Sequence, residues 1–282
     1  QRQMCIRDRA TTVPVSELMP LIGWRGVFWL MSALILIATV NLFVRLRDIE
    51  RDRMQFTVAA TSGPDTLSYK AIFTHPYFRR MALLGGVHQG GFMAVQTLWA
   101  GPWMIQVLQL SVSQASQVLF AFNLCLMLSY LLLSWWAPRH VSYGSQRGWP
   151  ALSVVGIGIG LSILLQLVML LLPYSWAWLL WLPFALLVTV STLAQTHVSL
   201  SFPSAQAGRV NSAYNLSLFI GAFSVQWGLG LLIDWFAAYG WDTSTSIRLA
   251  WLVYLLVQCF ALFRFVASKA LVIAPTGATT MQ

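Results

Sequence analysis

The side chains that could bind a ligand in this sequence are mostly amides and hydroxyls set within long apolar stretches. Asn211, Asn215 and Gln226 fall within about 60° of arc on a helix that turns 100° per residue. Amides donate and accept hydrogen bonds, but they do not readily supply acid–base chemistry. Three amides on one helix face therefore predict the lining of a polar path that binds a solute.

Small residues on another face of the same segment predict a packing surface. Gly221 and Gly228 are seven residues apart, so a helix places both on one side, where a neighbouring helix can approach closely. A polar stripe beside a packing stripe is what a bundle helix next to a substrate path needs.

A second pair of amides precedes this segment in the chain. Gln89 and Gln96 are also seven residues apart and would share a helix face, with His88 beside them. Glycines and a proline break make this helix easy to bend, as a gating helix requires. The alternative is that the glycines allow close packing and the glutamines bond to a neighbouring backbone. The predicted bending positions are Gly90, Gly91, Gly101 and Pro102.

Hydroxyl side chains form a third candidate stripe. Thr189, Thr192, Thr196 and Ser199 follow the spacing i, i+3, i+7 and i+10, which is one face of a helix. They line a path in one interpretation. In the other, each hydroxyl bonds back to its own helix, as hydroxyls in helices often do.

The sequence shows no grouping of residues for catalysis, metal binding or a cofactor. It contains no HExxH motif, no close pair of acids and no Cys/His cluster, and Asp234 is the only acid in any apolar stretch. Because Asp234 falls at the end of its stretch, it is more consistent with a solvated cap than with a proton site. We therefore expect no enzyme activity, no metal site and no cofactor.

The composition shows that these side chains lie in a membrane protein rather than in a soluble one. Of 282 residues, 58% are apolar and 9% are charged, and the mean hydropathy is +0.69. A soluble domain has about 25% charged residues, so a soluble enzyme, a DNA-binding domain and a disordered tail are excluded. The chain is predicted to be an all-α integral membrane protein.

Seven apolar stretches are long enough to cross a hydrocarbon layer of about 30 Å, which takes about 20 helical residues. The predicted transmembrane helices cover residues 24–44, 81–105, 118–136, 151–172, 176–200, 212–236 and 249–267.

The distribution of Lys and Arg predicts the orientation. The connections assigned to the inside hold twelve cations and those assigned to the outside hold one. The positive-inside rule then makes residues 10–23 external, and residues 45–80 and 269–282 cytoplasmic, in a multi-pass protein of the cytoplasmic (inner) membrane. The net charge of +9 therefore reflects orientation and lipid contact rather than nucleic-acid binding.

The first residues do not fit the rest of the chain. Residues 1–9, Gln-Arg-Gln-Met-Cys-Ile-Arg-Asp-Arg, resemble translated sequencing-adapter read-through, and the alternative is a short polar tail. Position 1 is Gln, so we expect the reading frame to continue upstream.

Three motifs give a resemblance to the major facilitator superfamily of secondary transporters. Gly23-Trp24-Arg25 is similar to the start of the family's sixth helix, Gln96–Trp103 to its seventh, and Ala207–Asn215 to the entry of its eleventh. The resemblance implies that 24–44 belongs to a missing N-terminal bundle, 45–80 joins the bundles, and 81–268 is the C-terminal six-helix bundle. The family's Gly-x-x-x-Asp-Arg loop has no counterpart, because Ala137-Pro138-Arg139-His140 carries no acid.

The resemblance implies a fragment of a secondary active transporter that moves a small solute by alternating access. Its expected partners are the solute, a coupling ion such as H⁺, the lipid bilayer and the missing N-terminal bundle. A polytopic membrane enzyme and a membrane scaffold subunit remain the alternatives at this point.

The orientation can be tested with Ser62→Cys and Ser113→Cys in intact cells treated with an impermeant thiol reagent. We expect position 113 to be labelled and position 62 to be protected, because the cation asymmetry puts 45–80 inside and 106–117 outside. Labelling of position 62 but not of 113 would reverse the orientation.

Overall fold

A computed structural model describes residues 13–54, 68–143, 148–203 and 206–267 of the chain. These residues fall into two compact units, Gln1–Thr66 and Leu67–Gln282. The side chains of 13–20 and 45–54 lie outside the description, as do the predictions for residues 1–9 and 269–282.

The first unit contains one long helix, α1 (Val13–Met54). Its helical geometry is interrupted at Gly23, which has φ 66° and ψ 171°. Glycine adopts such a left-handed φ without the steric cost that a Cβ brings. The apolar part, Leu21–Val44, is long enough to cross a membrane, and almost all of its side chains are exposed within this unit. The backbone continues as a helix through residues 45–54, which were predicted to begin the connecting loop.

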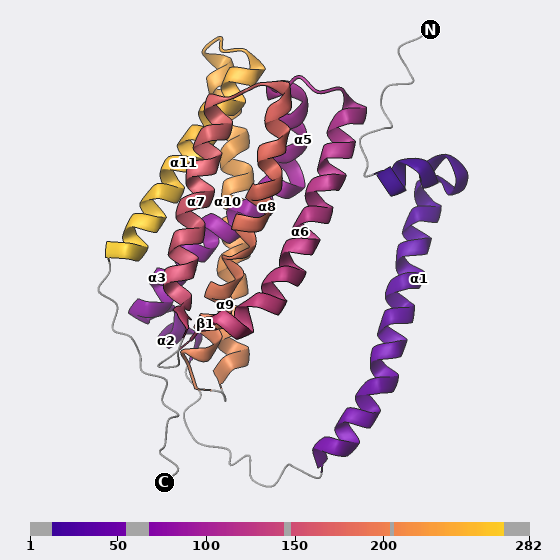
Figure 1. Ribbon diagram of the computed structural model, residues 1–282, viewed down its shortest axis with the longest axis vertical. Helices are drawn as coiled ribbons and strands as arrows, with labels where there is room; N and C mark the ends of the chain where they lie inside the picture. The colour runs from indigo at the N-terminus through magenta and orange to yellow at the C-terminus, as the bar shows by residue number, and fades with distance from the viewer. Residues whose placement is uncertain (1–12, 55–67, 144–147, 204–205, 268–282) are drawn as a thin grey trace. The chain divides into compact units, whose positions relative to one another are not determined.

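The second unit is a bundle of helices, shown in Figure 1. It opens with α2 (Tyr69–Thr74), a short helix whose N-terminus is capped by the Ser68 side chain. Ile72 is buried, so α2 is anchored to the bundle.

The predicted span at 81–105 is helical but irregular. Between Pro76 and Val107 it alternates α-helical and π-helical turns, and π turns are frequent at functional sites. Its segments are α3 (Pro76–Gly85), η1 (Gly86–Gly90), α4 (Gly91–Ala94), η2 (Val95–Trp99), α5 (Ala100–Pro102) and η3 (Trp103–Val107).

The other predicted spans appear at nearly the expected positions. Six stretches of the described residues are long and apolar enough to cross a membrane, and with the irregular series Pro76–Val107 they correspond to the seven predicted spans. They are Leu21–Val44 of α1, α6 (Val112–His140), α7 (Ala151–Leu171), the series η4 (Ser175–Leu180), α8 (Trp181–Thr189) and α9 (Thr192–Leu200), α10 (Ala207–Ala238) and α11 (Thr243–Ala267). A parallel bridge of two residues each, β1 (Val141–Ser142) with β2 (Trp149–Pro150), closes the α6–α7 connection.

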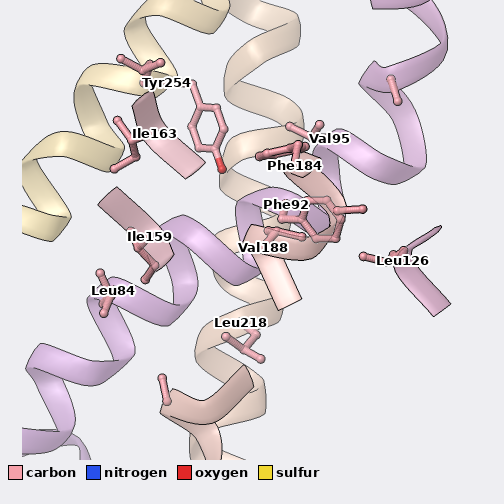
Figure 2. Packing of buried hydrophobic residues seen from close by; sticks show 14 of the residues in the cluster. Leu84, Phe92, Val95, Leu126, Ile159, Ile163, Phe184, Val188, Leu218 and Tyr254 are labelled. Atoms are coloured by element: carbon pink, nitrogen blue, oxygen red, sulfur yellow. The ribbon is translucent and has the colours of Figure 1, made fainter. Parts of the chain in front are cut away.

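Aromatic rings fill the centre of the bundle. Phe92 packs edge-on against Phe184 with ring centroids 5.8 Å apart, and Figure 2 shows the two with Val188 and Leu126 close by. Trp181 contacts Phe122 and Trp251 with centroid distances of 5.4 and 6.1 Å. These contacts join the irregular helix to α6, α8 and α11 through fully buried side chains.

The helix α10 crosses η1 in close backbone contact at glycines. A Cβ on Gly221 would overlap the carbonyl oxygen of Gly86, and one on Gly90 would overlap the carbonyl oxygen of Leu218. Gly85 and Gly91 face the hydroxyls of Tyr214 and Tyr254 in the same way.

The packing surface predicted to run from Gly221 to Gly228 does not continue along the whole face. Nothing lies within 4 Å of a Cβ at Gly228, and the same holds at Gly101. Two helices that cross at an angle separate on either side of the crossing point, so close contact is limited to about one turn.

The hydroxyl stripe also rests on a helix that is not continuous. A turn at residues 190–191 separates α8 from α9, and hydrogen bonds there run from residue i to i−3. This interruption changes the angular register that the spacing of Thr189, Thr192, Thr196 and Ser199 assumed.

We predict that Gly221→Ala lowers the free energy of unfolding by about 1–3 kcal/mol, because the added methyl forces two backbones apart. Gly228→Ala, on the same helix, is the matched control. It should be neutral or stabilise by up to about 1 kcal/mol, because alanine favours a helix and space is free.

The measurement is thermal denaturation of the detergent-purified chain, followed by the loss of its monomeric elution peak. Equal midpoints for the two variants would contradict the glycine crossing.

Candidate functional site

Three polar pairs join neighbouring helices of the bundle, and each includes at least one predicted lining residue. Gln96 on η2 donates from Nε2 to Oδ1 of Asn123 on α6, at 2.8 Å. Asn123 is exposed and also donates to the carbonyl of Leu119, 2.7 Å away. The bond therefore ties the irregular helix to α6 through groups that reach the bundle surface.

The amides of α10 face α9. Ser199 donates to Oδ1 of Asn211 at 2.5 Å, and Gln195 donates from Nε2 to Oδ1 of Asn215 at 3.2 Å. Asn215 is exposed and Asn211 is half-buried. These bonds use the side-chain oxygen of each asparagine. The side-chain Nδ2–H groups of both have no hydrogen-bond partner among the described residues.

Gln226 lies further along α10 and is exposed. Its backbone carbonyl oxygen accepts a hydrogen bond from the indole of Trp99 on η2, 3.3 Å away. The structure therefore brings Gln226 near the irregular helix rather than near α9, while Asn211 and Asn215 share one neighbour.

Gln89 and Gln96 have different surroundings, although the spacing placed them on one face. Gln89 lies in the π turn η1 and Gln96 in the π turn η2, and π turns change the number of residues per turn. Gln89 is half-buried, and its Oε1 is buried without a hydrogen-bond partner among the described residues.

Thr189 and Thr192 bond back to their own helix. Thr189 is fully buried and donates to the carbonyl of Leu186 at 2.7 Å, and Thr192 donates to the carbonyl of Thr189 at 2.7 Å. This geometry fits the alternative interpretation of the hydroxyl stripe, because a hydroxyl satisfied by its own backbone needs no solute.

The sequence analysis missed a polar network inside the bundle. Gln166 on α7 and Gln258 on α11 exchange two amide hydrogen bonds of 3.0 Å each, and both side chains are fully buried. Trp251 donates to Oε1 of Gln166 at 3.3 Å, and Ser162 lies 3.0 Å from Nε2 of His88. The isolated glutamines gave no spacing signal, because the pairing joins helices 92 residues apart in the chain.

A second cluster lies where α3 begins and α9 ends. The Tyr77 hydroxyl is 2.5 Å from Nδ1 of His197, and Ser201 donates to that hydroxyl at 3.2 Å. These hydrogen bonds link the start of α3 to the end of α9.

The groove found in the bundle is apolar and separate from the amide pairs. It has a volume of about 450 Å³ and lies between α3–η1, α10 and α11, where Gly86, Gly221, Gly228 and Tyr254 line it. Asp234, near the end of α10, is exposed. The described residues contain no group of three or more His, Cys, Asp or Glu that could hold a metal ion.

One comparison with known proteins gave a match. The family model of the Major Facilitator Superfamily matches residues 11–226, about three quarters of the chain, from α1 into α10. A search of curated proteins and a search of solved structures found no match.

Water access to the amide edge of α10 can be measured by thiol chemistry after removal of Cys5, Cys125 and Cys259. We expect Asn215→Cys to react with a charged methanethiosulfonate at least ten times faster than Leu216→Cys, because the reactive thiolate forms in water and not in lipid. Leu216 is the matched control, since it is 51% exposed and adjacent residues differ in depth by about 1.5 Å.

The reaction rates are read from the mass shift of the purified variants after timed labelling of membrane vesicles. Equal rates at the two positions would mean that the amide edge meets lipid or protein.

Proposed function

The chain belongs to the major facilitator superfamily and is therefore a multi-pass membrane transporter, and we propose that it moves a small solute across the cytoplasmic membrane by alternating access. Members of this family are transporters and not enzymes. In the proposed mechanism, residues 81–268 form one helix bundle that rocks against a second bundle, with the solute between them.

The observation that supports this proposal is the set of polar pairs at exposed or half-buried positions of membrane-spanning helices. Asn123, Asn215 and Gln226 are exposed, although their helices are long and apolar. An exposed amide that faced hydrocarbon would lose its hydrogen bonds to water at a cost of several kcal/mol. These residues are better accounted for by an aqueous path or by the second bundle.

The available hydrogen-bond groups suggest how a solute is held. Asn211 and Asn215 each use an oxygen within the bundle and keep their N–H groups free, so the α10 edge offers donors. Gln96 and Asn123 add a second pair on η2 and α6. No charged side chain takes part in these pairs, so they contact a solute without contributing a proton site or an ionic clamp.

Irregular helix geometry supports the conformational part of the proposal. Gln89 and Gly90 lie in the π turn η1 and Gln96 in η2. Gly91 begins the α-helical turn between them, and Gly101–Pro102 lie between η2 and η3. A helix with several such turns bends at lower cost than a regular one, because its hydrogen bonds are already rearranged. We propose that bending of the series Pro76–Val107 opens and closes the path.

The orientation and the coupling ion belong to the same proposal. The cation asymmetry supports a cytoplasmic C-terminus and a cytoplasmic loop at 45–80. H⁺ is the proposed coupling ion, and the amide pairs described above do not bind it.

Uptake of a panel of radiolabelled solutes tests the function directly, in cells that express this chain as part of a protein with both helix bundles. For a transported solute, we expect Asn215→Leu and Gln96→Leu each to lower uptake about ten-fold, which corresponds to the loss of one hydrogen bond of about 1.4 kcal/mol.

Thr189→Val is the matched control and should stay within about two-fold of the wild type, because its hydroxyl serves only its own helix. Membrane content of each variant is measured by immunoblot. Unchanged uptake in both leucine variants would show that the amides are packing groups.

A further inference from the structure

Two basic side chains lie at the end of α6 that the proposed orientation places on the cytoplasmic side. Both point toward the preceding turn of the helix. The Arg139 guanidinium lies 4.9 Å from the ring centroid of Trp135, and its Nη1 donates to the Trp135 carbonyl. The His140 ring stacks on Trp136 at 5.2 Å, with Nδ1 3.0 Å from the Trp136 carbonyl. Helical side chains lean toward the N-terminus, so both basic groups sit about one turn inside the helix end.

Aromatic rings mark the depth of this end in a bilayer. Trp135 is 58% exposed and Trp149 is 61% exposed. Strand β2 pairs with β1 and puts Trp149 opposite Val141, one residue beyond His140. Exposed indoles of membrane proteins concentrate at the level of the lipid headgroups, because the ring is apolar and its N–H is polar. Arg139 is therefore held at headgroup depth.

The guanidinium has no carboxylate partner in the described part of the bundle. The only acids whose side chains are described are Asp234 and Asp242. Asp234 is near the end of α10 and Asp242 caps the start of α11 by accepting from the Thr245 amide. Figure 1 shows the α10–α11 turn at the opposite end of the bundle from β1. One of the five guanidinium donors is used within α6, and the others remain available for an anion.

Apolar side chains extend from Arg139 along the same face of α6. Leu128, Leu131 and Trp135 precede Arg139 by eleven, eight and four residues, which is one helical stripe. Both leucines are more than half exposed. A ligand bound along this face would contact a cation and indole rings at one end. Over the next turns of the helix, about three in all, it would contact apolar side chains.

We propose that this end of α6 binds one anionic phospholipid, with its headgroup phosphate on Arg139 and an acyl chain along the leucine stripe. The phosphate would bridge the open guanidinium donors, a planar geometry that suits arginine. A soluble phosphate compound would use only the cation and leave the apolar stripe without a partner. The proposal is independent of the solute path, because it shares no residue with the amide pairs.

The test is native mass spectrometry of the full chain in detergent, titrated with phosphatidylglycerol or with phosphatidylcholine of the same acyl chains. We expect one tightly bound phosphatidylglycerol, and Arg139→Gln should weaken its binding about ten-fold, the loss of one charge-assisted hydrogen bond. Trp149→Leu should also weaken binding, although it changes no charge.

Arg79→Gln is the matched control. Arg79 is an exposed arginine of α3 at the same predicted membrane face, without an aromatic ring stacked on its guanidinium in the described contacts. Its substitution should change the affinity less than two-fold. An equal loss in both arginine variants, or none in Arg139→Gln, would overturn the site. Displacement of the lipid by equimolar glycerol 3-phosphate would overturn the assignment to a lipid.

Discussion

Direct backbone contact between α10 and the π turn η1 is the constraint on which the rest of the bundle depends. Gly86, Gly90 and Gly221 allow it, because any side chain at Gly90 or Gly221 would overlap a carbonyl oxygen of the opposite helix. In a membrane, helices associate through close packing rather than through the hydrophobic effect, so such contact contributes strongly. With α10 held at this crossing, its amide edge is directed toward α9, where Asn211 and Asn215 find their partners.

Polar side chains in the bundle follow the rule that a hydrogen-bonding group in hydrocarbon needs a partner, and they follow it in two ways. Gln166 and Gln258 are buried and bond to each other, which joins α7 to α11 away from the bundle surface. The amides at the surface bond across helices but keep donors free. The difference in burial, rather than in residue type, separates amides that hold the bundle together from amides that are available for a solute.

One partner of each polar pair lies on an irregular helix, and the other lies on α6 or α10. Gln96 lies on a π turn, and Gln195 and Ser199 follow the interruption between α8 and α9. Regular helices such as α6 and α7 pack around them. Irregular backbone in a membrane persists only where neighbouring helices or water satisfy the freed groups. This coincidence of polar pairs and bendable helices is what an alternating-access mechanism uses, and the lipid site proposed on α6 lies on a regular helix outside it.

The sequence by itself determined the membrane class, the positions of the spans and the resemblance to the transporter family. Composition and the lengths of apolar stretches depend only on local hydrophobicity, and the family model later matched residues 11–226. The helical spacing of α10 predicted one face for Asn211, Asn215 and Gln226, and in the structure the first two bond to α9 while Gln226 lies near Trp99. For Thr189 and Thr192 the spacing left two interpretations open, and the structure shows both hydroxyls bonded to their own helix. Nothing from a neighbouring helix lies within 4 Å of a Cβ at Gly228. No sequence pattern indicated the Gln166–Gln258 pair. Only the tertiary structure decided these points, because hydrogen-bond partners and crossing points are set by residues from distant parts of the chain.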